Sequence, residues 1–277
     1  MDLSPFDPLF RLPFAAGLLA VLVLSVLGVF LRLREEWLAA LGLAHIAAAG
    51  GLAGMAVGLP LVLGSPLAAA LGATVKALFR SRGNTAYALM ILFGWSLSLL
   101  LAANTPLGES LAHALVDGQL YFAGGRELVG LGILAALAIV ALPGLSRRLL
   151  RARFFPLYER ANRLRAWRWH LGFDLLVAVA IALGTATMGL MAAFACAFVP
   201  AWLAFRVSGS WRQAQALALL FGAAAYLAAF LVALRLDQPF GPLMVAVLLL
   251  EAPLVLAIVA LQRALRRRLL NSQAAGA

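Results

Sequence analysis

His45 is the one titratable side chain in the run LGLAHIAAAGGLAG, which covers residues 41–54. An imidazole can bind a metal ion, and the thioether and thiol groups of methionine and cysteine suit soft ions. Met191 and Cys196 lie in a later apolar segment, and Glu251 lies near the middle of the last one. Because polar groups inside an apolar span are usually there for function, we predict that these four residues line a metal or translocation path.

Each of these residues also has a structural interpretation. His45 can be a neutral imidazole that donates to a backbone carbonyl of a neighbouring helix, and Met191 and Cys196 can be packing groups. Glu251 lies two residues before Pro253 and can instead cap a break in its helix. Residue type alone leaves both interpretations open.

Gly50 and Gly54 are four residues apart, in the small-xxx-small pattern that lets two helices approach closely. We predict that they form a tight contact between two helices. Their segment either lines the translocation path or serves only for packing against a neighbouring helix.

The composition places these residues in a membrane. The 277-residue chain is 64% hydrophobic and 12% charged, with a mean hydropathy of +0.99. Soluble domains contain about 25% charged residues, so this much apolar surface indicates a polytopic, all-α membrane bundle. The net charge of +11 does not indicate nucleic acid, because the arginines form short clusters between apolar runs.

Nine apolar segments are predicted, and the whole chain, 1–277, is predicted to form one transmembrane domain. The third and sixth are shorter than the roughly 20 residues of a straight span, so we expect them to be broken, tilted or re-entrant. Eight spans are the alternative. The segments cover residues 12–31, 38–58, 67–79, 85–103, 127–145, 174–187, 189–205, 213–234 and 242–262.

The distribution of positive charge predicts the orientation. With the N-terminus outside, the inner loops and the C-terminal tail contain 19 of the 22 Lys and Arg residues. Asp174 is then expected to cap the sixth segment at the inner face. The outer stretch 104–126 contains Glu109, His113 and Asp117 at helical spacing, which suits either a cation at the entrance or a solvated surface helix.

The inner loop 146–172 contains eight arginines interleaved with aromatic residues. Such a segment can lie at the lipid headgroups, or it can form a short helix that docks onto a soluble subunit. Helical spacing predicts this helix from Leu157 to Arg168. The residues predicted to dock are Tyr158, Glu159, Arg160, Arg163 and Arg165.

Four motifs share an order and spacing with a known family. They are LAHIAAAGG, RSRGNTAYALMILFG, MGLMAAFACAFVPAW and LRLDQPFGPL. Together, over roughly residues 15–250, they resemble the membrane permease subunits of zinc/manganese/iron-type ABC importers. The positions that follow the family pattern in the last two motifs are Gly189, Pro200, Asp237, Pro239 and Gly241.

The resemblance implies a homodimeric permease in the inner membrane. Its partners would be a cytoplasmic ATP-binding subunit, an extracytoplasmic substrate-binding protein and membrane lipid, with loop 147–170 at the position of the family's coupling helix. The chain contains no Walker-type phosphate loop, so ATP is expected in the partner, and this chain is expected to be no enzyme and to bind no cofactor.

The family's second segment typically reads Gly-Asp-Ala-x-Ser-His-Ala-x-x-Pro-Gly, and its Asp and His look like metal-transit ligands. His45 and Gly50 match this pattern, but Leu41 stands where the family has its carboxylate. The substitution predicts a cargo other than the usual bare divalent ion.

Two other functions compete with this one. A secondary transporter would show an internal repeat and broken helices, and the short third and sixth segments favour it weakly. An intramembrane enzyme needs clustered catalytic groups, whereas the three histidines lie far apart in the sequence, at His45, His113 and His170.

Overall fold

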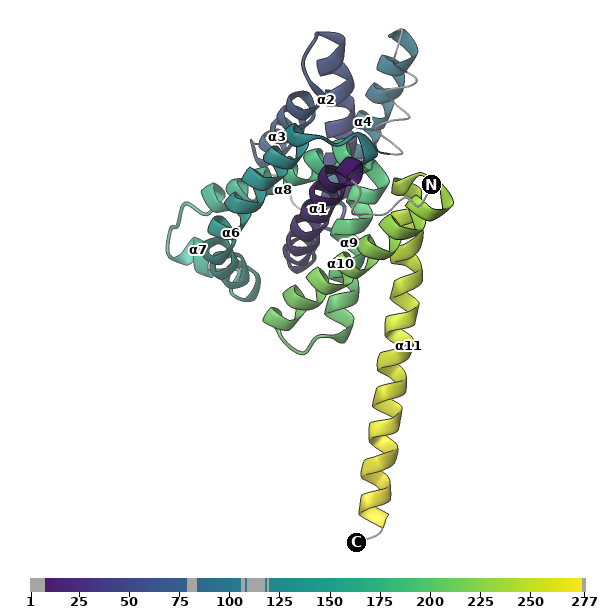
Figure 1. Ribbon diagram of the computed structural model, residues 1–277. Coiled ribbons are helices and arrows are strands. Elements are labelled where there is room, and N and C mark those ends of the chain that lie inside the picture. Colours follow the sequence, from purple (N-terminus) through teal and green to yellow (C-terminus); the bar gives the residue numbers. More distant parts are fainter. Residues whose placement is uncertain (1–7, 79–83, 106–107, 109–117, 119, 276–277) are drawn as a thin grey trace.

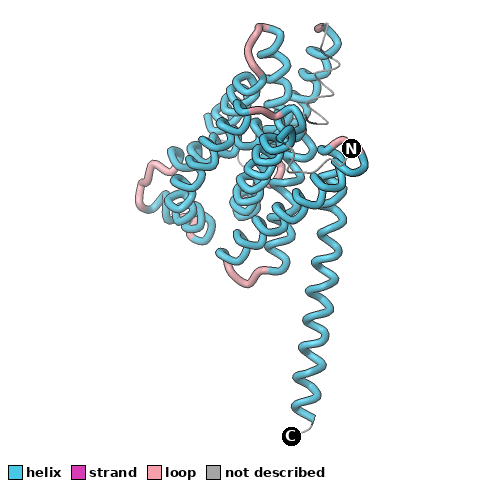
Figure 2. The backbone as a smooth tube through the Cα atoms, in the orientation of Figure 1, coloured by secondary structure: helices cyan, strands magenta, loops and turns pink. Residues whose placement is uncertain are grey.

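The chain folds into a bundle of long helices, and the computed structural model describes residues 8–78, 84–105, 108, 118 and 120–275 (Figure 1). Within this part, nine helices are long and apolar enough to cross a membrane, and no residue forms a strand (Figure 2). The all-α class and the nine predicted spans are confirmed. The spanning helices are α1 (Pro8–Leu33), α2 (Ala39–Ala56), α3 (Leu61–Leu78), α4 (Asn84–Asn104), α6 (Gly125–Phe154), α8 (Trp167–Met188), α9 (Leu190–Val207), α10 (Trp211–Leu236) and α11 (Phe240–Ala275).

Four helices form the centre of the bundle. α1, α2 and α8 bury 67% of their most apolar stretch and α9 buries 61%, whereas α4 and α11 bury 17%. The peripheral helices α3, α4, α6 and α11 present leucine, isoleucine and valine side chains outward, which suits contact with lipid or with another subunit. α11 also extends well beyond the rest of the bundle at its C-terminal end (Figure 1).

α2 and α3 form a close antiparallel hairpin built on small residues. A methyl group at Gly50 would lie 2.0 Å from Cβ of Ala68, and one at Gly54 would lie 3.2 Å from Cα of Gly64. Larger side chains at these positions would force the helices apart, because packed interiors have no spare room. The hairpin is therefore a stiff unit that contains His45.

Replacing Gly28 by valine is expected to separate α1 from α9. A Cβ atom at Gly28 would lie 1.8 Å from the carbonyl oxygen of Ala197, a backbone atom that cannot rotate away. We expect a loss of about 1–3 kcal/mol in the free energy of unfolding, measured by thermal unfolding of the detergent-solubilised protein. Gly132→Val is the matched control, since nothing lies within 4 Å of a Cβ there. Equal unfolding temperatures for the two variants would contradict the close α1–α9 contact.

The residues of the last two sequence motifs lie mainly where helices end and begin. Gly189 is the one residue between α8 and α9, and its φ of 89° is a conformation that favours glycine. Asp237 ends α10 in the left-handed region, with φ 50°. Pro239 directly precedes α11, Gly241 lies in the first turn of α11, and Pro200 lies within α9.

The predicted helix breaks are wrong. The third and sixth segments are neither broken nor re-entrant, because α3 begins earlier, at Leu61, and α8 begins at Trp167, outside the apolar stretch used to predict it. Glu251 caps no break, since α11 runs continuously past Pro253. The helices are longer than predicted because α3 continues through Pro66 to the apolar residues before it, and α8 includes the aromatic and basic residues of its first two turns.

Candidate functional site

His45 lies buried on α2, with its Nδ1 atom 2.9 Å from the carbonyl oxygen of Leu41. The backbone of His45 also packs directly against Gly94 of α4. When Nδ1 carries the proton and donates to Leu41, Nε2 keeps the lone pair that binds metals. The acceptor carbonyl is thus on the same helix, not on a neighbouring one as the structural interpretation expected.

The structure separates the predicted soft-metal residues. Cys196 is fully buried, with its Sγ atom 3.9 Å from Sδ of Met188, whereas Met191 is 50% exposed. Cys196 and Met191 therefore do not face a common site.

The other residues predicted to bind a metal ion do not come together in the part of the chain that the structure describes. Glu251 is half-buried on the peripheral helix α11. Glu109, His113 and Asp117 lie outside the described residues. Within the part of the chain that the structure describes, no three His, Cys, Asp or Glu side chains gather where they could hold a metal ion.

The docking helix predicted in the basic loop is much shorter than expected. α7 spans only Tyr158–Ala161, so the prediction of a helix from Leu157 to Arg168 is wrong. The backbone N–H of Leu164 donates to the carbonyl oxygen of Glu159, and Arg163 adopts a left-handed φ of 48°. A left-handed residue just past the last turn is a common way for a helix to end.

Contacts on both sides hold α7 between its flanking helices. Glu159 accepts a hydrogen bond from Nε1 of Trp169 at 3.1 Å and lies 3.4 Å from Nε2 of His170, both on α8. The guanidinium of Arg151, on α6, lies 5.0 Å from the ring centroid of Tyr158. α7 is therefore in contact with both of its flanking helices.

The outer surface of this loop is basic and apolar. Arg163 and Arg165 are exposed, and the side chain of Arg160 lies outside the described part. The large apolar side chains exposed beside them are Phe155, Leu157, Leu164 and Trp167. Such a mixed patch marks a surface that binds a protein partner or lipid headgroups.

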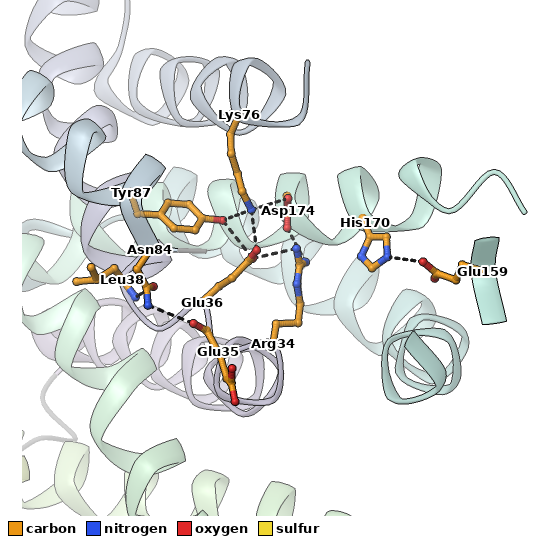
Figure 3. Close-up of polar contacts among 10 residues, drawn as sticks. All are labelled: Arg34, Glu35, Glu36, Leu38, Lys76, Asn84, Tyr87, Glu159, His170 and Asp174. Carbon is orange, nitrogen blue, oxygen red and sulfur yellow. Dashed lines mark hydrogen bonds and ion pairs between the residues drawn. The ribbon is translucent and has the colours of Figure 1, made fainter. Parts of the chain in front are cut away.

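Next to the loop lies a group of interacting polar side chains, here named the buried ion cluster (Figure 3). It joins the turn between α1 and α2 to α3, α4 and α8. Its members are Arg34, Glu36, Lys76, Tyr87 and Asp174.

The four charges of the cluster form a closed ring in which each carboxylate contacts both cations. Arg34 lies 2.9 Å from Glu36 and 2.6 Å from Asp174, and Lys76 lies 3.0 Å and 3.4 Å from the same two carboxylates. The hydroxyl of Tyr87 accepts from Lys76 at 2.7 Å and donates to Glu36 at 3.4 Å. The ring has no net charge.

The charged side chains of the cluster are only 4–13% exposed. Burial alone would lower the pKa of Arg34, but the carboxylates of Asp174 and Glu36 outweigh it, and the pKa lies above its usual value. Arg34 therefore stays charged. Buried charges are tolerated only when they are paired and hydrogen-bonded, a condition that this ring meets.

Sequence reasoning missed this cluster. It treated Arg34 and Lys76 as topology signals, and it expected Asp174 to cap a helix. That expectation is wrong, because Asp174 lies two turns inside α8. The available signal was the presence of acids, Glu36 and Asp174, within the otherwise basic segments at one end of the bundle.

Comparison with known proteins supports the fold and gives the family. The chain matches the model of the ABC 3 transport family over residues 7–261. Among solved structures, it is similar to PsaBC from Streptococcus pneumoniae in complex with Fab, with a TM-score of 0.76 and 16% identity over 88% of this chain and 89% of that one. No curated protein matches the chain.

A second solved structure is an inward-facing conformation of a transporter assigned to the metal-chelate ABC type. It has a TM-score of 0.72 and 16% identity, and covers 95% of this chain and 91% of that one. The family match extends over all nine spanning helices, and it confirms the resemblance drawn from the order and spacing of the motifs. The chain belongs to the ABC 3 transport family and is a multi-pass membrane permease of the ABC transporter type.

Proposed function

We propose that the chain is the membrane subunit of an ABC importer that moves a metal ion or a metal chelate across the inner membrane. The family match over nearly the whole chain carries this proposal. The metal cargo is supported by His45 on a central helix and by the similarity to a transporter of the metal-chelate type.

The proposed complex contains two copies of this chain, cytoplasmic ATP-binding subunits and an extracytoplasmic substrate-binding protein. The end that contains α7 faces the cytoplasm, because positively charged loops stay on that side. ATP is bound by the partner, and this chain binds no cofactor. The apolar outer faces of α3, α4 and α11 offer surface for lipid and for the second copy.

Energy coupling is proposed to pass through α7. Its loop exposes Arg163 and Arg165 beside large apolar side chains, a combination suited to a protein partner. When the ATP-binding subunits close, they displace α7, and its contacts with α6 and α8 transmit the displacement to the spans. The motion alternates access between the two sides of the membrane.

The residues around His45 favour a cargo that brings its own ligands. Leu41 lies one turn before His45 and supplies only its backbone carbonyl, which fixes the imidazole. A single imidazole is a poor substitute for the several ligands that a bare Zn²⁺ ion requires. A metal chelate needs fewer ligands from the protein, so we propose that a chelate is the preferred cargo.

Co-purification tests the assembly. The tagged chain, co-expressed with its ATP-binding subunit, is expected to purify in detergent as a complex with equal numbers of the two subunits. Light scattering combined with absorbance measures this ratio. A chain that purifies alone and transports without an ATP-binding subunit would favour the secondary transporter instead.

Replacing His45 by alanine is expected to lower uptake roughly tenfold, the scale on which changes around a metal act, while the complex stays assembled. Ile46→Ala is the control, since Ile46 is the next residue on α2 and is half-buried. Uptake is measured in proteoliposomes with Zn²⁺, Mn²⁺ and an iron chelate as separate probes. Wild-type uptake by the His45 variant would leave His45 a purely structural residue.

A further inference from the structure

We propose that the buried ion cluster is the joint through which the docking loop moves the α2–α3 hairpin during transport. The inference rests on the proposed function, because it assigns a path for the energy that an ATP-binding subunit supplies. It concerns the residues between α7, where that subunit is proposed to dock, and the hairpin that contains His45 (Figure 3).

On the loop side, both helices that flank α7 hold the turn between α1 and α2. Asp174 lies one turn after His170 on α8, where α7 is in contact, and it pairs with Arg34 in that turn. Arg153, near the end of α6, pairs with Glu35 in the same turn. A displacement of α7 therefore reaches residues 34–36 mainly through the buried Arg34–Asp174 pair, and the exposed Arg153–Glu35 pair is a weaker second route.

On the other side, the cluster closes the open end of the hairpin. Glu36 lies three residues before α2 begins, and Lys76 lies two residues before α3 ends. Their ion pair connects the two helices at this end. The close contacts of Gly50 and Gly54 with α3 connect them along their length. A shift of the cluster therefore moves the hairpin as one body, including His45 and the turn at residues 57–60.

The turn between α1 and α2 has little freedom of its own. Glu35 adopts a left-handed φ of 59°, a conformation that persists in a non-glycine residue only when its surroundings hold it. Asn84, at the start of α4, donates to the carbonyl oxygen of Glu35 at 3.3 Å and accepts from the N–H of Leu38 at 3.2 Å. A stiff turn passes displacement on rather than absorbing it.

The cluster consists of charged side chains, although apolar side chains would stabilise the fold as well. This choice indicates that the cluster sets the position of the hairpin. Replacing a buried ion pair by apolar side chains is often neutral or stabilising, so stability alone does not explain the ring. An ion pair joins two particular side chains, unlike an apolar contact, and each carboxylate here contacts both cations. The ring can therefore exchange partners between two positions of the hairpin without leaving a charge unpaired.

The test uses the complex with its ATP-binding subunit in nanodiscs and needs no knowledge of the cargo. Val57→Cys and Leu59→Cys place reporters on the exposed turn of the hairpin, and Cys196 stays unlabelled because it is fully buried. Maleimide labelling rates are compared between the nucleotide-free and the vanadate-trapped states. The charge-balanced variant Glu36→Gln/Lys76→Met removes one cation and one anion and keeps the Arg34–Asp174 pair.

In the otherwise unaltered complex, we expect labelling rates that differ by about threefold or more between the two states, which corresponds to the lower part of the usual range of coupling energies. In Glu36→Gln/Lys76→Met, the difference is expected to disappear while assembly and ATP hydrolysis stay within about twofold of their original values. Thr187→Val is the control, because Thr187 is equally buried on α8 but bonds only within its own helix. It is expected to keep the full difference.

A milder variant covers the case in which the double variant does not assemble. Tyr87→Phe removes only the hydroxyl that bridges Lys76 and Glu36, and it is expected to reduce the labelling difference about twofold. The proposal would be overturned if the variant that assembles kept the full difference in labelling rate between the nucleotide-free and the vanadate-trapped states. A complex that hydrolyses ATP but shows no nucleotide-dependent labelling before any cluster substitution would also overturn the proposal, whereas a chain that forms no complex with an ATP-binding subunit would contradict the proposed function.

Discussion

Replacing Lys76 by methionine is expected to lower the thermal unfolding temperature by roughly 10 °C. The substitution leaves Glu36 and Asp174 with Arg34 as their only cation, in a site where the charged side chains are 4–13% exposed. Removing one partner of a buried ion pair costs about 3–5 kcal/mol, because a charge then remains uncompensated away from water. Thermal unfolding of the detergent-solubilised chain measures the effect.

Two further variants make this test specific. Arg212→Met removes an exposed cation from another helix and is expected to leave the unfolding temperature nearly unchanged. Adding Glu36→Gln to Lys76→Met restores the charge balance and is expected to recover most of the loss. If the Lys76 variant were as stable as the Arg212 variant, the ring would not be the tightly paired, buried structure described.

Reversing the charge of Arg163 and Arg165 together is expected to abolish co-purification with the ATP-binding subunit. Both side chains are exposed beside α7. Placing like charges against each other at an interface costs several kcal/mol, so binding is expected to weaken by roughly a hundredfold or more. The measurement is the amount of ATP-binding subunit that a tagged permease retains in detergent.

Arg235→Glu is the matched control for this pair. Arg235 is also exposed but lies at the end of α10, the end expected to face outward, and its reversal is expected to leave binding intact. Retention of the ATP-binding subunit by the Arg163/Arg165 variant would show that the docking surface lies elsewhere.

The spans could be predicted from the sequence because each depends on local hydropathy. The division between α8 and α9 follows from Gly189, since one glycine with a φ of 89° separates two helices that hydropathy alone would nearly merge. The tight positions of Gly50 and Gly54 follow from their spacing on one helix face. These features need no knowledge of which helices are neighbours.

The buried ion cluster could not be predicted in the same way. Arg34 and Asp174 are 140 residues apart, and only the packing of α1, α3 and α8 brings them together. The length of α7 also depends on a backbone choice at Arg163, which helical periodicity does not reveal. The different exposure of Met191 and Cys196 could not be predicted for a related reason, since the two residues lie in one segment and only helix packing separates them.

ATP-dependent uptake tests the central claim most directly. The chain is reconstituted into proteoliposomes with its ATP-binding subunit, ATP is enclosed, the substrate-binding protein is added outside, and Zn²⁺, Mn²⁺ and an iron chelate are the separate probes. We predict that one of these probes accumulates only when both ATP and the ATP-binding subunit are present. Equal accumulation without the ATP-binding subunit, or no accumulation of any metal probe by the complete complex, would contradict a metal-importing ABC permease.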